Sequence, residues 1–286
     1  MYHRLARTER YRWWKPIVEV VLCVLFWLLL VLVVVLPTSF LIGPGEDGPR
    51  GLLKLGIAIA SMLPAACLAA RVTRGAWRPL LSVDGHVRWR WLGVCLVVAL
   101  AQVVVRFGVE AALAAAGHPV TLERGPWVGW APFAPLALVV VVAIVPQAAA
   151  EEVLVRGTLV QALGAWIRQP WVAILVSSAL FGLAHGLPLA GFASTATLGV
   201  AAAWLTIRTG GLEAAVALHA LHNVSWFLLD AATGRSDRWV TDMFVDVRWI
   251  QTLVDVPLAG LYAVAIGVLY SRRFTSTSAT SPDGGP

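Results

Sequence analysis

Long apolar runs constrain this sequence more than any other feature. The first extends from Ile17 to Leu36 and is almost entirely aliphatic or aromatic. About 20 such residues are enough for a helix to cross the hydrocarbon core of a bilayer. Similar runs recur along the chain. Of its 286 residues, 59% are hydrophobic and only 13% are charged, whereas soluble domains have about 25% charged residues. The sequence therefore predicts an all-α, polytopic membrane protein.

Eight membrane spans are predicted, with both termini in the cytoplasm. They lie at about 17–36, 52–70, 91–116, 132–166, 171–185, 192–207, 212–229 and 250–270. The fourth is too long for one perpendicular crossing. Either a span ends near Ala150 and leaves the acids that follow at its cytoplasmic mouth, or a long helix kinked at Pro146 carries Glu151 to mid-membrane. Residues 1–274 are predicted to form one integral membrane domain, and the Ser-, Thr-, Gly- and Pro-rich segment 275–286 a disordered cytoplasmic tail.

The distribution of basic residues supports this topology. Of the 22 lysines and arginines, fifteen fall in predicted cytoplasmic segments, six fall in outer segments and Arg106 lies inside a span. This asymmetry follows the positive-inside rule and indicates a multi-pass protein of the cell membrane. The basic residues lie at span ends rather than in one patch with interleaved aromatics, so nucleic acid is not an expected partner. The sequence leaves the oligomeric state open.

Two further features of the spans have simple structural interpretations. Arg106 and Glu110 are four residues apart in the third span, the spacing of a helical salt bridge that lowers the cost of burying both charges. Cys23, Cys67 and Cys95 lie singly in apolar runs, so we expect buried packing rather than disulfides or a cysteine metal site.

Two adjacent carboxylates, Glu151 and Glu152, interrupt the fourth apolar run. Residues four apart share a helix face, so Arg156 is the natural partner of Glu152, whereas Glu151 lies about 100° around the axis and is free to face a cavity. In a site of low dielectric, repulsion and desolvation can give one such acid the basicity of a general base. A cytoplasmic ion-pair cluster at a helix end is the competing interpretation.

Imidazoles and an amide occur in two later spans. His185 follows Phe181 by four residues, and His219, His222 and Asn223 fall within a sector of about 100° on one helix. His219 and Asn223 present hydrogen-bond donors side by side, as an oxyanion requires. A zinc site is the rival chemistry, with Glu151, His185 and His219 as ligands and His222 as a further candidate. No HExxH motif is present, and we favour chemistry without a metal cofactor.

These stretches resemble the CAAX-processing and bacteriocin-processing (CPBP, or Abi) family of intramembrane proteases, which is marked by EExxxR, FxxxH and HxxxN motifs. Here the motifs are Glu151–Arg156, Phe181–His185 and His219–Asn223, and the resemblance covers about residues 133–230, the expected protease core. It implies that Glu151 activates water with help from His185, that His219 and Asn223 stabilise the oxyanion, and that Glu152 and Arg156 support them. The family includes proteins described as metalloproteases and as metal-independent glutamate proteases.

The expected function is hydrolysis of a peptide bond in a membrane-associated peptide or protein, by direct attack of water. No serine or cysteine is placed beside a partner base, Ser177 and Ser178 near His185 being the nearest candidates. Two alternatives stay open. One is a non-catalytic membrane scaffold or bacteriocin self-immunity protein. The other is a proton- or ion-coupled transporter, which is disfavoured because no pair of broken helices repeats in two halves.

Overall fold

The computed structural model describes residues 1–118, 125–243 and 248–275. Within these residues the chain is helical, and its sole β-type pairing is an isolated bridge between Ser82 and Gly211. The predicted all-α class is thus confirmed. The tail was expected at 275–286. Thr275 is instead the last residue of a helix, and residues 276–286 lie outside the described residues.

Eight long helical segments follow one another and coincide with the predicted spans. Two of the first four contain a π-helical stretch, η2 and η4. The segments are α1 (Lys15–Leu30), η2 (Val31–Val35) and α2 (Leu36–Ile42); α3 (Gly48–Ala60) and α4 (Met62–Arg74); α5 (Trp89–Ala115); α6 (Trp130–Glu152), η4 (Val153–Leu159) and α7 (Val160–Trp166); α8 (Pro170–Ala184); α9 (Leu189–Thr209); α10 (Glu213–Ala232); and α12 (Trp249–Thr275). Short helices η1 (Tyr2–Arg4), η3 (Arg78–Leu80), η5 (Ser236–Arg238) and α11 (Trp239–Met243) lie at their ends.

Six of these segments, among the described residues, have the length and apolarity of a membrane span. The two others are α8, which has 15 residues and is about 22 Å long, and α10, which carries His219, His222 and Asn223. The chain is therefore a multi-pass membrane protein. The eight predicted helices are present, whereas the number of complete crossings stays a prediction.

The fourth segment settles how the helix continues past the paired acids. Residues 130–166 form one helical segment of 37 residues, with Pro135 and Pro146 inside α6. The helix does not end near Ala150, so the structure favours the long-helix interpretation. Glu151 and Glu152 are the last two residues of α6, immediately before the π-helical stretch η4. Such stretches are frequent at functional sites.

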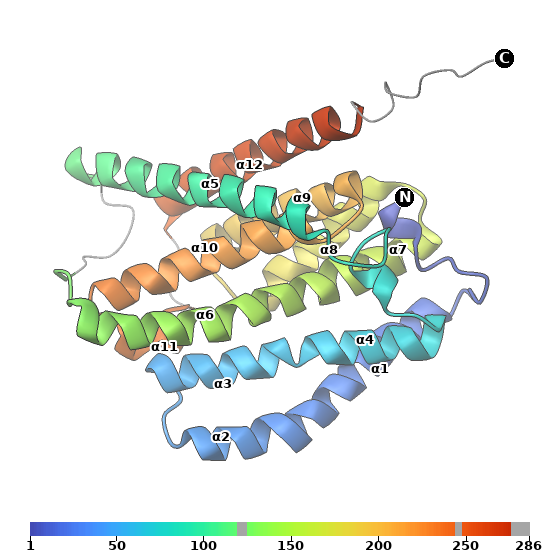
Figure 1. Ribbon diagram of the computed structural model, residues 1–286, viewed down its shortest axis with the longest axis horizontal. Helices are drawn as coiled ribbons and strands as arrows, with labels where there is room; N and C mark the ends of the chain where they lie inside the picture. The colour runs from blue at the N-terminus through green and yellow to red at the C-terminus, as the bar shows by residue number, and fades with distance from the viewer. Residues whose placement is uncertain (119–124, 244–247, 276–286) are drawn as a thin grey trace.

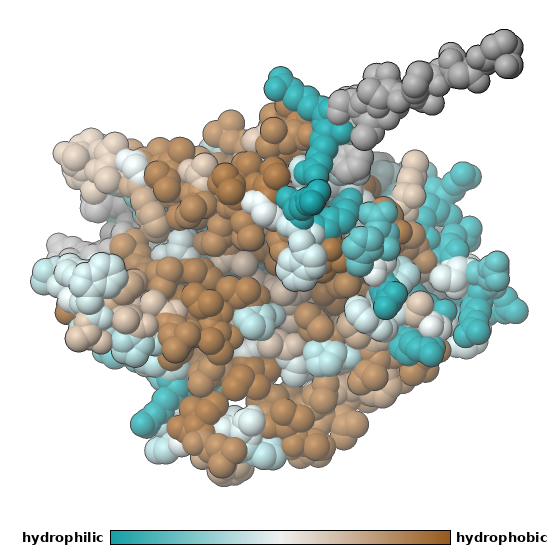
Figure 2. All heavy atoms as spheres, in the orientation of Figure 1, coloured by the Kyte–Doolittle hydropathy of each residue, from teal (hydrophilic) through white to brown (hydrophobic). Residues whose placement is uncertain are grey.

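The helices form a bundle with α6 and α10 in its middle. In Figure 1, α5 and α12 lie on one side of this pair, and α3, α4, α1 and α2 lie on the other. The N-terminus and the last turn of α12 are at the same end of the bundle. Figure 2 shows hydrophilic residues gathered at that end and hydrophobic residues across the middle, the pattern of a protein embedded in a bilayer.

Exposed tryptophans lie at the first residue of three long helices. Trp89 begins α5, Trp130 begins α6 and Trp249 begins α12, with 74%, 74% and 55% of their surface exposed. Tryptophan is enriched where a membrane meets water. From Trp249 to Tyr270, α12 extends about 31 Å at 1.5 Å per residue, which matches a hydrocarbon core of about 30 Å.

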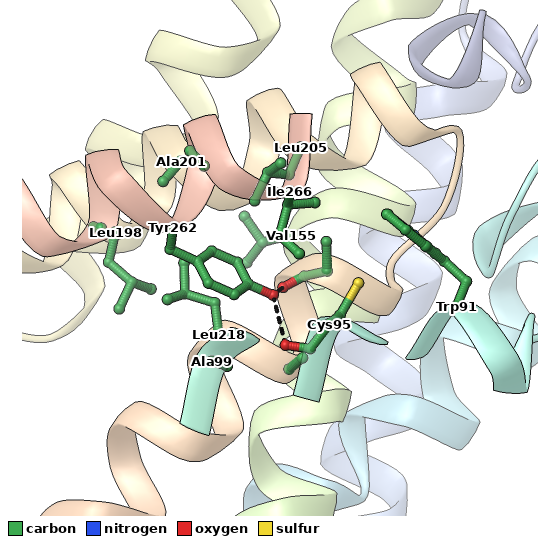
Figure 3. Close-up of a cluster of buried hydrophobic side chains, with 14 of the residues drawn as sticks. Trp91, Cys95, Ala99, Val155, Leu198, Ala201, Leu205, Leu218, Tyr262 and Ile266 are labelled. Atoms are coloured by element: carbon green, nitrogen blue, oxygen red, sulfur yellow. Dashed lines mark hydrogen bonds between the residues drawn. The ribbon is translucent and has the colours of Figure 1, made fainter. Parts of the chain in front are cut away.

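The largest buried apolar cluster joins α5, α9, α10 and α12 (Figure 3). Small residues at its contacts, including Ala99, Ala201 and Ala217, let the helices approach closely. The Tyr262 hydroxyl, on α12, donates to the carbonyl of Ala214 at 3.0 Å and so links α12 to α10. Packing of this kind fixes α10, which carries the HxxxN motif. All three cysteines are free. Cys23 and Cys95 are buried as expected, whereas Cys67 is only half-buried.

Candidate active site

The site contains a fully buried ion pair between Arg156 and Glu152. Arg156 Nη1 donates to Glu152 Oε1 at 2.9 Å, and both side chains are fully buried. Arg156 Nη2 also donates to the carbonyl of Gly199 on α9 at 3.2 Å, and its guanidinium lies over the Phe181 ring, 4.5 Å from the centroid. The pairing predicted from the four-residue spacing is confirmed. Arg156 thereby ties the helix that carries the acids to α8 and α9.

His219 connects the two acids from α10. Its Nδ1 lies 2.8 Å from Glu152 Oε1, and its Nε2 lies 3.5 Å from Glu151 Oε2. The start of α10 is anchored by Glu213, which accepts hydrogen bonds from the backbone and guanidinium of Arg88. This anchor and the Tyr262 contact hold the register that places His219 between the carboxylates.

Glu151 has a different environment from Glu152. Its side chain is 14% exposed, and its Oε1 accepts a 2.7 Å hydrogen bond from Gln147 Nε2, one turn earlier on α6. Its Oε2 is buried and makes no hydrogen bond with any residue that the structure describes. One oxygen is therefore held in place, and the other faces His219 Nε2. Sequence reasoning missed Gln147, although an amide in an apolar helix one turn before the acids was an available signal.

His185 belongs to the site through Phe181. It is the residue after the end of α8, and its Nδ1 lies 2.7 Å from the Phe181 carbonyl. Because a carbonyl can only accept, Nδ1 carries the proton and Nε2 is left available. The Phe181 ring packs edge-on against both imidazoles, with centroid distances of 4.6 Å to His185 and 5.6 Å to His219. No hydrogen bond joins His185 to either acid among the described residues.

The remaining candidates make no hydrogen bond or ion pair with the two acids in the described part of the chain. Asn223 and His222 are half-buried on α10, one turn beyond His219. Ser177 and Ser178 are buried and both donate to the Ile174 carbonyl of their own helix, at 3.2 and 2.6 Å. The structure thus brings together Glu151, Glu152, Arg156 and His219, with His185 held beside them by Phe181.

The zinc ligand set requires Glu151, His185 and His219, with His222 as an option. Within residues 1–118, 125–243 and 248–275, no group of three or more His, Cys, Asp or Glu side chains is arranged to hold a metal ion. As placed, the four candidate ligands do not fit a metal centre, and we derive no step through one.

The comparison with protein families bears on the helices just described. Residues 130–225 match the family model for Rce1-like proteins, described as type II CAAX prenyl endopeptidase Rce1-like. The matched stretch contains all three motifs and almost all of the predicted core at 133–230. Residues 130–225 are called the Rce1-like segment below because of this similarity. The match confirms the resemblance to the CPBP proteases. No curated protein and no solved structure matches the chain.

Outside the Rce1-like segment, α5 and α12 contribute a second buried charge cluster. Arg106 Nε lies 3.0 Å from Glu110 Oε1 and 3.1 Å from Asp255 Oδ1, so the predicted pair is confirmed and Asp255 is added to it. The Arg106 guanidinium lies 3.9 Å from the centroid of the Trp226 ring on α10. Ser194 on α9 donates to Asp255 at 3.3 Å. The cluster joins α5 and α12 to α9 and α10, the last two helices of the Rce1-like segment.

Proposed function

We propose that the protein is an intramembrane endopeptidase that hydrolyses a peptide bond of a membrane-associated peptide or protein. The observation that carries this proposal is Glu151 Oε2, a buried carboxylate oxygen that faces His219 Nε2 at 3.5 Å inside a membrane helix bundle. An ionisable side chain inside a membrane helix bundle has a large energetic cost and is therefore a candidate functional group. The Rce1-like match supports proteolysis as its function.

Glu151 is the general base of the proposed reaction. As water attacks the scissile carbonyl carbon, a C–O bond forms, the carbonyl π electrons move to oxygen, and the water proton passes to Glu151 Oε2. When the tetrahedral intermediate collapses, the C–N bond breaks and Glu151 returns the proton to the leaving amine. One water is consumed, two peptides are released, and no covalent enzyme intermediate forms.

The other groups supply charge balance and hydrogen bonds. Arg156 pairs with Glu152, and His219 lies between the two carboxylates. In the proposed reaction His219 Nδ1 donates to Glu152, and its Nε2 side donates to the developing oxyanion. Asn223, one turn further along α10, is proposed as the second donor, and His185 Nε2 as a partner for the attacking water. Glu152 and Arg156 hold the arrangement.

The membrane topology completes the proposal. Eight helices that all cross the membrane place both termini on one side, and the basic residues assign that side to the cytoplasm of the cell membrane. From Glu213 at the start of α10, His219 lies about 9 Å along the helix, toward the middle of the bundle. A substrate anchored in the bilayer would reach Glu151 without leaving the membrane.

The test is cleavage by the purified full chain in lipid nanodiscs. The substrates are a prenylated C-terminal peptide, the class that the family name specifies, and a library of membrane-anchored peptides without a prenyl group. The native protein is expected to release a defined product before and after exhaustive chelation. Loss of cleavage on chelation with rescue by zinc would instead establish a metal-dependent protease.

Two other outcomes would overturn the proposal. A folded native protein that cleaves neither substrate class would be the non-catalytic scaffold or immunity protein. Solute flux into sealed proteoliposomes, lost on neutralising Glu151, would identify the transporter. Product analysis by mass spectrometry and flux measurement on the same preparation separate these cases.

A further inference from the structure

We propose that Gln147 is a positioning residue that orients the carboxylate of Glu151. The inference rests on the proposed function and adds a residue outside the three motifs. Gln147 precedes Glu151 by one turn of α6, is 8% exposed, and donates from Nε2 to Glu151 Oε1 at 2.7 Å. It makes direct contact with the proposed base.

The hydrogen bond restricts which oxygen of Glu151 faces the reaction. With Oε1 held by Gln147, rotation of the carboxylate would break a charge-assisted hydrogen bond, the stronger kind in a buried site. Oε2 therefore stays directed at His219 Nε2, 3.5 Å away. In the proposed reaction Oε2 must meet the proton of the attacking water, so the contact presents the base in one orientation.

The local backbone makes this side-chain contact more important. Pro146 has no N–H, so the hydrogen bond of the α6 ladder to the Val142 carbonyl is missing in the turn that leads to Gln147. Beyond Glu152 the helix changes to the π-helical stretch η4. Between these two irregular points, the hydrogen bond from Gln147 to Glu151 spans the intervening turn and fixes the carboxylate from its own helix.

Gln161 provides a matched control in the same helical segment. It is fully buried, and its Nε2 donates to the Pro79 carbonyl at 2.8 Å, while its oxygen accepts from Arg74. It contacts neither Glu151 nor His219. Replacing either glutamine with methionine preserves size and removes the amide. Comparing the two variants therefore separates an effect on Glu151 from the general effect of losing a buried amide.

The experiment compares Gln147→Met, Gln161→Met and the native chain in nanodiscs. We expect kcat of Gln147→Met to fall about 10- to 100-fold while KM stays within about twofold, because misplacing a catalytic group slows the chemical step more than binding. Gln161→Met should unfold at a lower temperature and keep its kcat. An unchanged kcat in Gln147→Met would overturn the proposal, as would an equal loss in both variants.

A second readout does not depend on activity. The antisymmetric carboxylate stretch of Glu151, isolated by subtracting the infrared spectrum of Glu151→Gln, reports the hydrogen bonds of this side chain. It should shift in Gln147→Met and stay unchanged in Gln161→Met. No shift would overturn the proposal even if the native protein cleaves no substrate, so the two proposals fail separately. If Gln147→Met does not fold, Gln147→Asn, whose amide is one methylene short of Glu151, replaces it with the same expectations.

Discussion

At the scale of single residues, the main feature is the difference between two adjacent acids. Glu152 is fully buried and bound by Arg156 and His219, whereas Glu151 is 14% exposed and bound through one oxygen by Gln147. Glutamate thus supports the structure at position 152, whereas at position 151 it is available for chemistry. The helix causes this difference, because consecutive residues point about 100° apart.

The substitution Arg156→Met tests the structural role of the Glu152–Arg156 ion pair. Arg156→Met leaves Glu152 buried without its ion-pair partner, and such a loss costs about 3–5 kcal/mol. We expect unfolding in detergent to show a destabilisation of this size. Lys54→Met breaks the Lys54–Glu46 pair, whose glutamate is 91% exposed, and should change stability by less than about 1 kcal/mol. Equal effects of the two substitutions would contradict the structure.

Asp47, outside the spans, predicts a pH dependence. Burial acts to raise its pKa, but hydrogen bonds from Thr241, Gly48 and Val240 outweigh burial and hold the pKa below the ordinary 3.8. Since the folded pKa is depressed, the stabilisation is present above about pH 3.8 and is lost as pH falls through the lower folded value. Unfolding measured between pH 3 and 6 should show this loss in the native chain. Asp47→Asn should abolish it, and an identical pH profile in both would contradict the assignment.

Local residue pairs could be predicted from the sequence, and tertiary partners could not. The spacing of four residues indicated the contacts of Glu152 with Arg156 and of Arg106 with Glu110, because helix geometry alone brings them together. Asp255 lies on a distant helix, and its contact with Arg106 depends on how α5 packs against α12. The three motifs indicated which helices meet, but not that His219 would lie between both acids.

At the scale of elements, the N-terminal arm, residues 1–14, closes the end of the helix that carries the acids. Arg4 donates to the Gly164 carbonyl at 3.2 Å, and Arg7 to the Ala165 carbonyl at 2.9 Å. The last carbonyls of a helix have no partner within the helix, and cations are favourable there. The arm thus stabilises the C-terminal end of α7. The sequence indicated only a basic, cytoplasmic segment, since its contacts are more than 150 residues away along the chain.

Gly164 lies directly against this arm. A Cβ at Gly164 would overlap the His3 carbonyl oxygen, so Gly164→Ala must displace the arm. We expect a destabilisation of about 1–3 kcal/mol and faster proteolysis within residues 1–14. Gly108→Ala, where a Cβ meets open space in α5, should be neutral or stabilising by up to about 1 kcal/mol. Equal protease resistance of the two variants would argue against the arm contact.

At the scale of the whole molecule, helices outside the Rce1-like segment surround it on both sides. α5 and α12 pack against α9 and α10, while α3 lies along α6 (Figure 1). The apolar runs were sufficient to predict the helices and their order along the chain. They could not give the number of complete crossings, because α8 is short and α10 contains several polar residues.

The position of the termini gives a prediction about the assembled protein. The N-terminus and the end of α12 are at one end of the bundle, and the connection between α2 and α3 is at the other (Figure 1). Epitope tags at residues 1 and 286 should be accessible from the same side of sealed membrane vesicles, and a tag inserted after Gly45 from the opposite side. Termini on opposite sides would contradict the eight-crossing topology.

The central claim is that Glu151 activates water for peptide hydrolysis. Its most direct test is the rate at which folded Glu151→Gln cleaves a defined substrate of the native protein, with thermal unfolding used to confirm the fold. Glutamine preserves size and hydrogen bonding but cannot accept the proton, and general-base catalysis contributes about 10²- to 10⁴-fold. We predict a fall in kcat of at least about 100-fold. Cleavage by Glu151→Gln within about threefold of the native rate would contradict the account.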